Sequence, residues 1–166
     1  MPEAEPHRLI AWDRELADAH QRLRQALQVA RAALDTGDTD GYVALFTEDA
    51  EATEETRSGE LEVRKGRAEI RKLVLKFHDR ADFPGHQHQM GQFVFEPDPE
   101  GRPDHWVVRS YAWATINNRM GPPHLHWCGH VRDVIAKIDG LWLIRSKAIM
   151  GWGGQVLARF QQRKRT

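Results

Sequence analysis

The sequence has 166 residues, of which 40% are hydrophobic and 29% charged, and its 24 basic and 24 acidic side chains leave a formal net charge of zero. This composition excludes a disordered chain and favours one folded domain over residues 1–166, with frayed ends at about 1–8 and 157–166. The balanced charge provides no overall field that would attract nucleic acid or a membrane surface.

Cysteine usage and the first residues bear on the cellular compartment. The single cysteine, Cys128, excludes an internal disulfide framework and fits a reducing compartment. The chain begins Met-Pro-Glu-Ala-Glu-Pro, which lacks the basic start of a signal peptide. No apolar run approaches the roughly 20 residues needed to cross a bilayer. We therefore expect a cytoplasmic protein.

Helical periodicity marks three segments in the first half of the chain. The first runs from about Leu9 to Leu34, and Asp35-Thr-Gly-Asp38 predicts its end and a cap for the next helix. A short second helix is expected from Thr39 to Phe46, followed by a strand from roughly Glu51 to Thr56. The third helix is expected to start near Arg67 and to end before Pro84.

After Pro84 the periodicity changes to two, which is typical of strands. The candidate strands are His86–Glu96, His105–Asn117, His124–Ile138 and Leu141–Trp152. Asp139-Gly140 predicts a tight hairpin between the last two. Helices followed by long strands predict an α+β fold, in which three N-terminal helices pack in a strongly curved antiparallel sheet and form a cone-shaped barrel with a pocket.

Three motifs resemble those of a known family. The stretch Ala33 to Ala50, ALDTGDTDGYVALFTEDA, is similar to the opening signature of SnoaL-like proteins. Lys65-Gly-Arg-Ala-Glu-Ile70 resembles their second signature, and Asp139-Gly-Leu-Trp-Leu-Ile144 resembles their closing hairpin. This superfamily, also called nuclear-transport-factor-2-like or cystatin-like, includes scytalone dehydratase, a dehydrochlorinase, polyketide cyclases, ketosteroid isomerase, small subunits of ring-hydroxylating dioxygenases and binding proteins without catalysis. The fold alone therefore does not decide the function.

The resemblance is nearest to the scytalone dehydratase and dehydrochlorinase branch, and it implies a catalytic pair. In that branch an Asp at the end of the first helix holds a His on the first strand after the third helix, and Asp35 and His88 occupy these positions. A neutral imidazole is a base near pH 7, and a carboxylate fixes its tautomer. The predicted function is a cofactor-independent, dehydratase-like lyase or isomerase. Its substrate is expected to be an apolar, aromatic, polyketide or terpenoid small molecule.

Other interpretations of these residues remain open. An Asp before Thr-Gly-Asp also hydrogen-bonds turn backbone, and a His in a chain with nine of them is often a satisfied core or surface group. Glu54 lies near the base position of ketosteroid isomerases, but Val29 or Ala30 stands where their first-helix Tyr is expected, so that oxyanion hole is incomplete.

A non-catalytic function is the alternative to an enzyme. The chain would then be a ligand-binding or oligomeric support subunit, similar to the small subunit of a ring-hydroxylating dioxygenase. Broad sheets of this kind pair in symmetric oligomers, so we expect a homodimer or homotrimer. The other expected partner is a small-molecule substrate, with neither nucleic acid nor membrane.

Candidate substrate-binding residues are distributed over the helices and strands. The set is Tyr42, Glu54, Tyr111, Trp113, His126 and His130. On the strand that starts at His105, one face carries Tyr111 and Trp113 and the other Ser110 and Ala112, and one of these faces lines the pocket. An aromatic lining suits a flat, apolar ligand, although Trp113 also fits a core or interface position. Arg145 and Lys147 are expected to be solvated or at an interface.

A metal site is a further alternative. His86-Gln-His88 and His124-Leu-His126 each place two imidazoles on one face of a strand, and His130 lies beyond. No Asp, Glu or Cys lies at an obvious ligand spacing, and the resemblance implies no metal. We therefore expect neither a metal nor another cofactor.

Overall fold

The computed structural model describes residues 14–56, 58–117 and 121–152, with side chains in the first helix described from residue 18 onward. In chain order the elements are α1 (Arg14–Thr36), α2 (Thr39–Ala44), β1 (Phe46–Glu55), β2 (Leu61–Lys65), α3 (Arg67–His78), β3 (His86–Pro97), β4 (His105–Ile116), β5 (His124–Ile138) and β6 (Leu141–Gly151). The frayed ends predicted at about 1–8 and 157–166 lie outside the described residues.

Helix α1 ends where the sequence predicts. Its fully or largely buried side chains recur at intervals of three and four residues and form one face: Leu23, Leu27, Ala30 and Leu34. Gly37, with a φ of 79°, adopts the left-handed conformation that terminates the helix. The Asp38 carboxylate then accepts a 2.8 Å hydrogen bond from the backbone N–H of Gly41 and caps α2.

The segment between α2 and α3 differs from its prediction. β1 starts at Phe46 rather than near Glu51, and Phe46 is buried at its start. β2 was not predicted, yet it pairs antiparallel with β1. Its apolar residues Leu61 and Val63 are 46% and 43% exposed, so the strand lacks the buried apolar face that makes a strand recognisable in a sequence. α3 begins at Arg67 as predicted and ends at His78.

The strands form a single six-stranded sheet in the order β2-β1-β6-β5-β4-β3. Strands β3 to β6 pair antiparallel in succession. Asp139 and Gly140, with φ of 50° and 80°, form the tight hairpin that was predicted between β5 and β6. The prediction of an antiparallel sheet is wrong at one position, because β1 pairs with β6 in parallel. A parallel pair needs a long connection, which the chain from β2 to β5 supplies.

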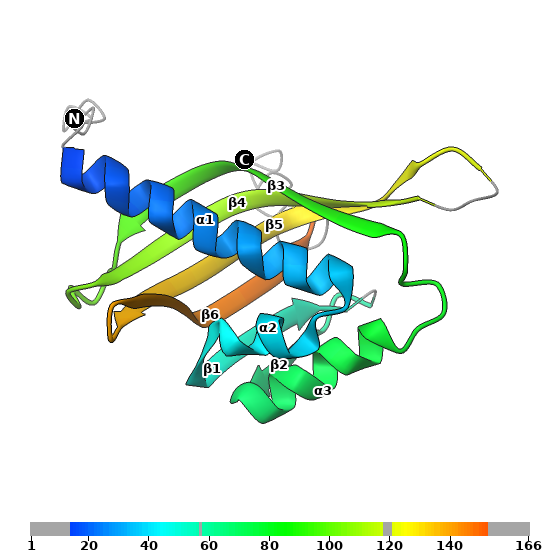
Figure 1. Ribbon diagram of the computed structural model, residues 1–166, viewed down its shortest axis with the longest axis horizontal. Helices are drawn as coiled ribbons and strands as arrows, with labels where there is room; N and C mark the ends of the chain where they lie inside the picture. The colour runs from blue at the N-terminus through cyan, green and yellow to red at the C-terminus, as the bar shows by residue number, and fades with distance from the viewer. Residues whose placement is uncertain (1–13, 57, 118–120, 153–166) are drawn as a thin grey trace, which may run out of the picture.

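Helix α1 covers one face of the sheet, which we call the inner face; the opposite face is the outer face. Figure 1 shows α1, in blue, lying across the long strands, and α1 contacts β3 and β6. Register irregularities interrupt the β3–β4, β4–β5 and β5–β6 pairs, and such bulges bend strands. The result is an α+β, cone-like fold with a curved sheet around the helix.

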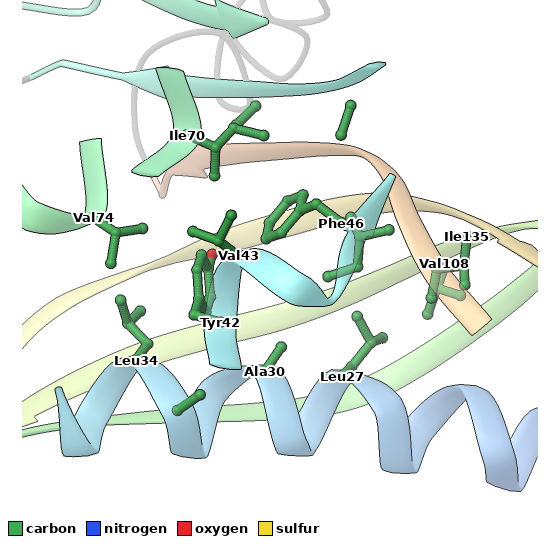
Figure 2. Packing of buried hydrophobic residues seen from close by; sticks show 14 of the residues in the cluster. Leu27, Ala30, Leu34, Tyr42, Val43, Phe46, Ile70, Val74, Val108 and Ile135 are labelled. Atoms are coloured by element: carbon green, nitrogen blue, oxygen red, sulfur yellow. The ribbon is translucent and has the colours of Figure 1, made fainter. Parts of the chain in front are cut away.

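The core lies between the helices and the inner face. Figure 2 shows Leu27 of α1 and Phe46 of β1 close to Val108 of β4 and Ile135 of β5, all buried. Burying a side chain of this size contributes about 1.5–3 kcal/mol to the stability of the fold.

None of the described helices is long and apolar enough to span a membrane.

Candidate functional site

Asp35 and His88 meet where the end of α1 packs against the start of β3. Asp35 lies in the last turn of α1, and His88 is the third residue of β3. Asp35 Oδ2 accepts a 2.8 Å hydrogen bond from the backbone N–H of His88, and Asp35 Oδ1 contacts the ring nitrogen Nδ1 of His88. The two side chains are 16% and 17% exposed, respectively. The carboxylate therefore holds both the backbone and the ring of His88.

This contact determines which ring nitrogen of His88 carries the proton. An ionised carboxylate only accepts hydrogen bonds, so the facing Nδ1 is the donor. In the neutral ring, Nε2 then keeps its lone pair on the side away from Asp35. An imidazole held in this way takes up a proton at Nε2, and the carboxylate stabilises the imidazolium that forms.

His86 and Phe83 lie beside the His88 ring, and His126 lies beside His86. His86 is buried and donates through Nδ1 to the backbone carbonyl of Phe83 at 2.7 Å. The Phe83 ring stacks on His86 at 5.0 Å between centroids and lies 6.2 Å from the His88 ring. His126 approaches His86 edge-on at 5.2 Å. The structure thus places His126, a predicted site residue, beside His86.

The metal alternative depends on how these histidines are grouped. Nδ1 of His86 faces a carbonyl, and Nδ1 of His88 faces a carboxylate. Within residues 14–56, 58–117 and 121–152, no three His, Cys, Asp or Glu side chains are grouped so that they could hold a metal ion.

A buried charged group farther along the inner face was not predicted. Lys147 Nζ of β6 lies 2.6 Å from Asp133 Oδ1 of β5, and these side chains are 3% and 0% exposed. The expectation that Lys147 is solvated is therefore wrong. Burial lowers the pKa of the Lys147 ammonium, Asp133 opposes this effect, and the nearby charge of Arg31 adds to the lowering. Arg31, on α1, is itself buried.

Tyr42 and Glu54, two predicted substrate-binding residues, lie within electrostatic range of each other, and Tyr42 also lies within range of Arg31 and Asp133. Tyr42 is buried on α2 with its ring 5.2 Å from that of Phe46, and burial raises its pKa to about 12. Glu54 pairs with Ile149 of β6, and burial, followed by the charge of Glu62, raises its pKa. A role in substrate contact stays a prediction for both residues.

Three other predicted substrate-binding residues lie on the outer face, away from His88. His88 pairs with the buried Ala114 of β4, whereas Tyr111 and Trp113 alternate with that inner set and are 44% and 38% exposed. His130 pairs with Tyr111 and therefore shares its face. The prediction that these three residues line a pocket together with His88 is therefore wrong. At the corresponding inner positions β4 carries Ser110, Ala112 and Ala114, all of them small and buried.

The sequence and the structure were compared with those of known proteins. A family model described as a SnoaL-like domain matches residues 15–148. No curated protein matches the sequence.

Among solved structures, ActVI-ORFA from Streptomyces coelicolor is 24% identical with a TM-score of 0.70, covering 81% of this chain and 98% of that one. A protein from Novosphingobium aromaticivorans, provisionally assigned as a scytalone dehydratase, is 19% identical with a TM-score of 0.68, covering 84% and 87%. A protein of unknown function with a cystatin-like fold from Nostoc punctiforme is 22% identical with a TM-score of 0.64, covering 83% and 95%. At these identities the similarity establishes the fold.

Proposed function

Because the chain belongs to the family of SnoaL-like domains, we propose that it is a lyase or isomerase in which His88 removes a proton from a small organic molecule. The observation that carries this proposal is the double contact of Asp35 with the backbone and the ring of His88. A carboxylate that served only the turn would not need to face the ring nitrogen of a neighbouring strand. The structural similarity to a protein provisionally assigned as a scytalone dehydratase supports the same reaction type.

The proposed reaction uses side chains of the chain alone. Nε2 of His88 accepts a proton from a carbon of the substrate, and the electron pair of the broken C–H bond forms a C=C bond. The imidazolium is stabilised by Asp35 and returns its proton, either to a departing hydroxyl group, which leaves as water, or to another carbon, which shifts the double bond. The first outcome is a dehydration and the second an isomerisation.

Deuterium exchange tests the proposal without knowledge of the natural substrate. A panel of flat bicyclic ketones, including 1-tetralone, 2-tetralone and their hydroxy derivatives, is incubated with the protein in D₂O. Loss of the proton next to the carbonyl is then followed by NMR. We expect exchange above the buffer rate, and we expect His88→Ala to lower it about 10²–10⁴-fold, the usual contribution of a general base.

A histidine far from the pair provides the matched control. His105 begins β4 at the end of the strand opposite Ala114, the partner of His88. His105→Ala should retain exchange, whereas equal exchange by wild type and His88→Ala for every ketone would contradict the proposal. That result would favour the alternative, a non-catalytic ligand-binding or support subunit.

A further inference from the structure

Several buried polar atoms have no hydrogen-bond partner within the described part of the protein, and three of them belong to residues on or facing the middle of the inner face. They are Nη2 of Arg31, Oγ of Ser110 and Oδ2 of Asp133. Their residues are 7%, 3% and 0% exposed. A buried polar group without a partner is destabilising, and more so if it is charged, so such groups need an explanation.

Arg31 is the member of this set closest to the proposed base. It precedes Asp35 by one helical turn, which places the two side chains on the same side of α1, about 5–6 Å apart at their Cβ atoms. Its Nε donates to the sulfur of Met90 at 3.2 Å. Met90 lies two residues beyond His88 on the inner face of β3, roughly 7 Å along the strand. Arg31 therefore contacts β3 two residues beyond the proposed base.

Ser110 lies on the inner face of β4, near Met90, the residue that Arg31 contacts. Met90 pairs with Ala112 of β4, and Ser110 is the next β4 residue with its side chain on that face. Because Ser110 pairs with Val131 and Val108 pairs with Asp133, the hydroxyl lies between Met90 and the buried Asp133/Lys147 pair. Arg31 and Ser110 thus supply hydrogen-bond donors from two elements.

The acidic side chains near Arg31 are paired with other residues. Asp133 binds Lys147, and Asp35 holds His88. Within the described ranges, the Arg31 guanidinium forms no ion pair, and its one hydrogen-bond acceptor is a thioether, which is weak. The Met side chain is flexible, so an oxygen with negative charge would replace it with a gain in interaction energy.

We propose that Arg31, supported by Ser110, is the subsite for a ketone oxygen of the substrate. This inference rests on the proposed function and names its substrate class, enolisable ketones. When His88 takes the proton next to the carbonyl, the C–H electron pair forms the C=C bond and the C=O π pair moves onto oxygen. Arg31 donates an N–H to that enolate oxygen and stabilises its charge.

The ionisation of bound 2-naphthol tests this subsite separately from catalysis. Naphtholate has the planar shape and the oxygen charge of the 2-tetralone enolate, and its absorbance differs from that of neutral naphthol. A cationic subsite binds the anion at least about tenfold more tightly and so lowers the pKa of bound 2-naphthol, whereas an apolar pocket raises it. We expect a lowered pKa in wild type and in His88→Ala.

Variants at Arg31 decide the origin of the effect. Arg31→Gln should abolish the lowering, and Arg31→Lys should retain part of it. The exposed Arg22→Gln on the same helix is the control. A raised or unchanged pKa in wild type, an absence of binding, or an equal lowering in Arg31→Gln would overturn the inference. If Arg31→Gln does not fold, the wild-type shift and Arg31→Lys decide the question.

The two experiments fail in different ways. If ketone exchange depends on His88 but the pKa of bound naphthol does not depend on Arg31, the proposed function is supported and the Arg31 subsite is contradicted. If the pKa of bound naphthol depends on Arg31 but no ketone is exchanged, an anion subsite is supported and the proton-transfer function is contradicted.

Discussion

The Asp35 carboxylate contacts both the backbone N–H and the ring Nδ1 of His88, so one side chain at the end of α1 sets the position of β3 and the orientation of the proposed base. Asp35→Asn keeps an acceptor oxygen but replaces the other oxygen with a donor group, which no longer fixes the His88 tautomer. We expect ketone exchange to fall about 10²–10⁴-fold. Asp79→Asn, an exposed residue after α3, is the control, and wild-type exchange by Asp35→Asn would contradict this role.

The burial of Tyr42 is expected to make the folded protein less stable at alkaline pH. Burial raises its pKa from 10.0 to about 12, so between these values the folded state keeps a proton that the unfolded chain has lost. Stability therefore falls as the pH rises through this window, by about 1.4 kcal/mol at pH ~11. Urea unfolding at pH ~9 and ~11 should show this decrease in wild type and not in Tyr42→Phe. Tyr111→Phe, at the exposed tyrosine, should behave as wild type.

The buried Asp133/Lys147 pair predicts an asymmetry between single and double variants. Lys147→Met leaves Asp133 as an unpaired buried charge and should lower the free energy of unfolding by about 3–5 kcal/mol. The double variant Asp133→Leu/Lys147→Met should recover most of this loss, because two apolar side chains carry no desolvation cost. Lys65→Met, at an exposed lysine, should change stability by less than about 1 kcal/mol. Equal stabilities for Lys147→Met and Lys65→Met would contradict this account.

Exposed aromatic residues on the outer face are the ones that we expect to form a subunit contact. The Tyr111 and Trp152 rings meet edge to face at 5.0 Å and are 44% and 45% exposed, with Trp113 on the same strand as Tyr111. Aromatic residues are enriched at subunit interfaces. Light scattering should give the mass of a dimer or trimer for wild type and of a monomer for Tyr111→Ser/Trp113→Ser. Leu141→Ser, at the exposed hairpin, should leave the mass unchanged. A monomeric wild type would contradict the expected oligomer.

Local sequence signals were sufficient for most of the elements, whereas Asp35 and His88 were singled out by the resemblance to a known family. The turn after Asp35 and the Asp139-Gly140 hairpin involve left-handed residues that few side chains adopt, so their positions can be read from the sequence. The distance between Asp35 and His88 was not predictable, because it depends on how α1 packs against β3. The parallel pairing of β1 with β6 was not predictable for a similar reason, because it depends on contacts between strands that are separated by most of the chain.

The side chains on the inner face were predicted poorly for two physical reasons. The aromatic residues of β4 were considered as a pocket lining, but the helix that covers this face leaves room for Ser110 and Ala112 rather than Tyr111 or Trp113. On β6, a bulge between the pairs at Ile144 and Ser146 shifts the register by one residue, and such a shift moves every later side chain to the other face. That shift places Lys147 inside, opposite Asp133.

The most direct test of the central claim is a ¹⁵N NMR measurement of the two ring nitrogens of His88. We expect the neutral ring to carry its proton on Nδ1 and to leave Nε2 bare, and we expect Asp35→Asn to produce a mixture of tautomers. A proton on Nε2 in the wild-type protein would contradict the account, because that nitrogen could then donate a hydrogen bond to a substrate but could not remove its proton.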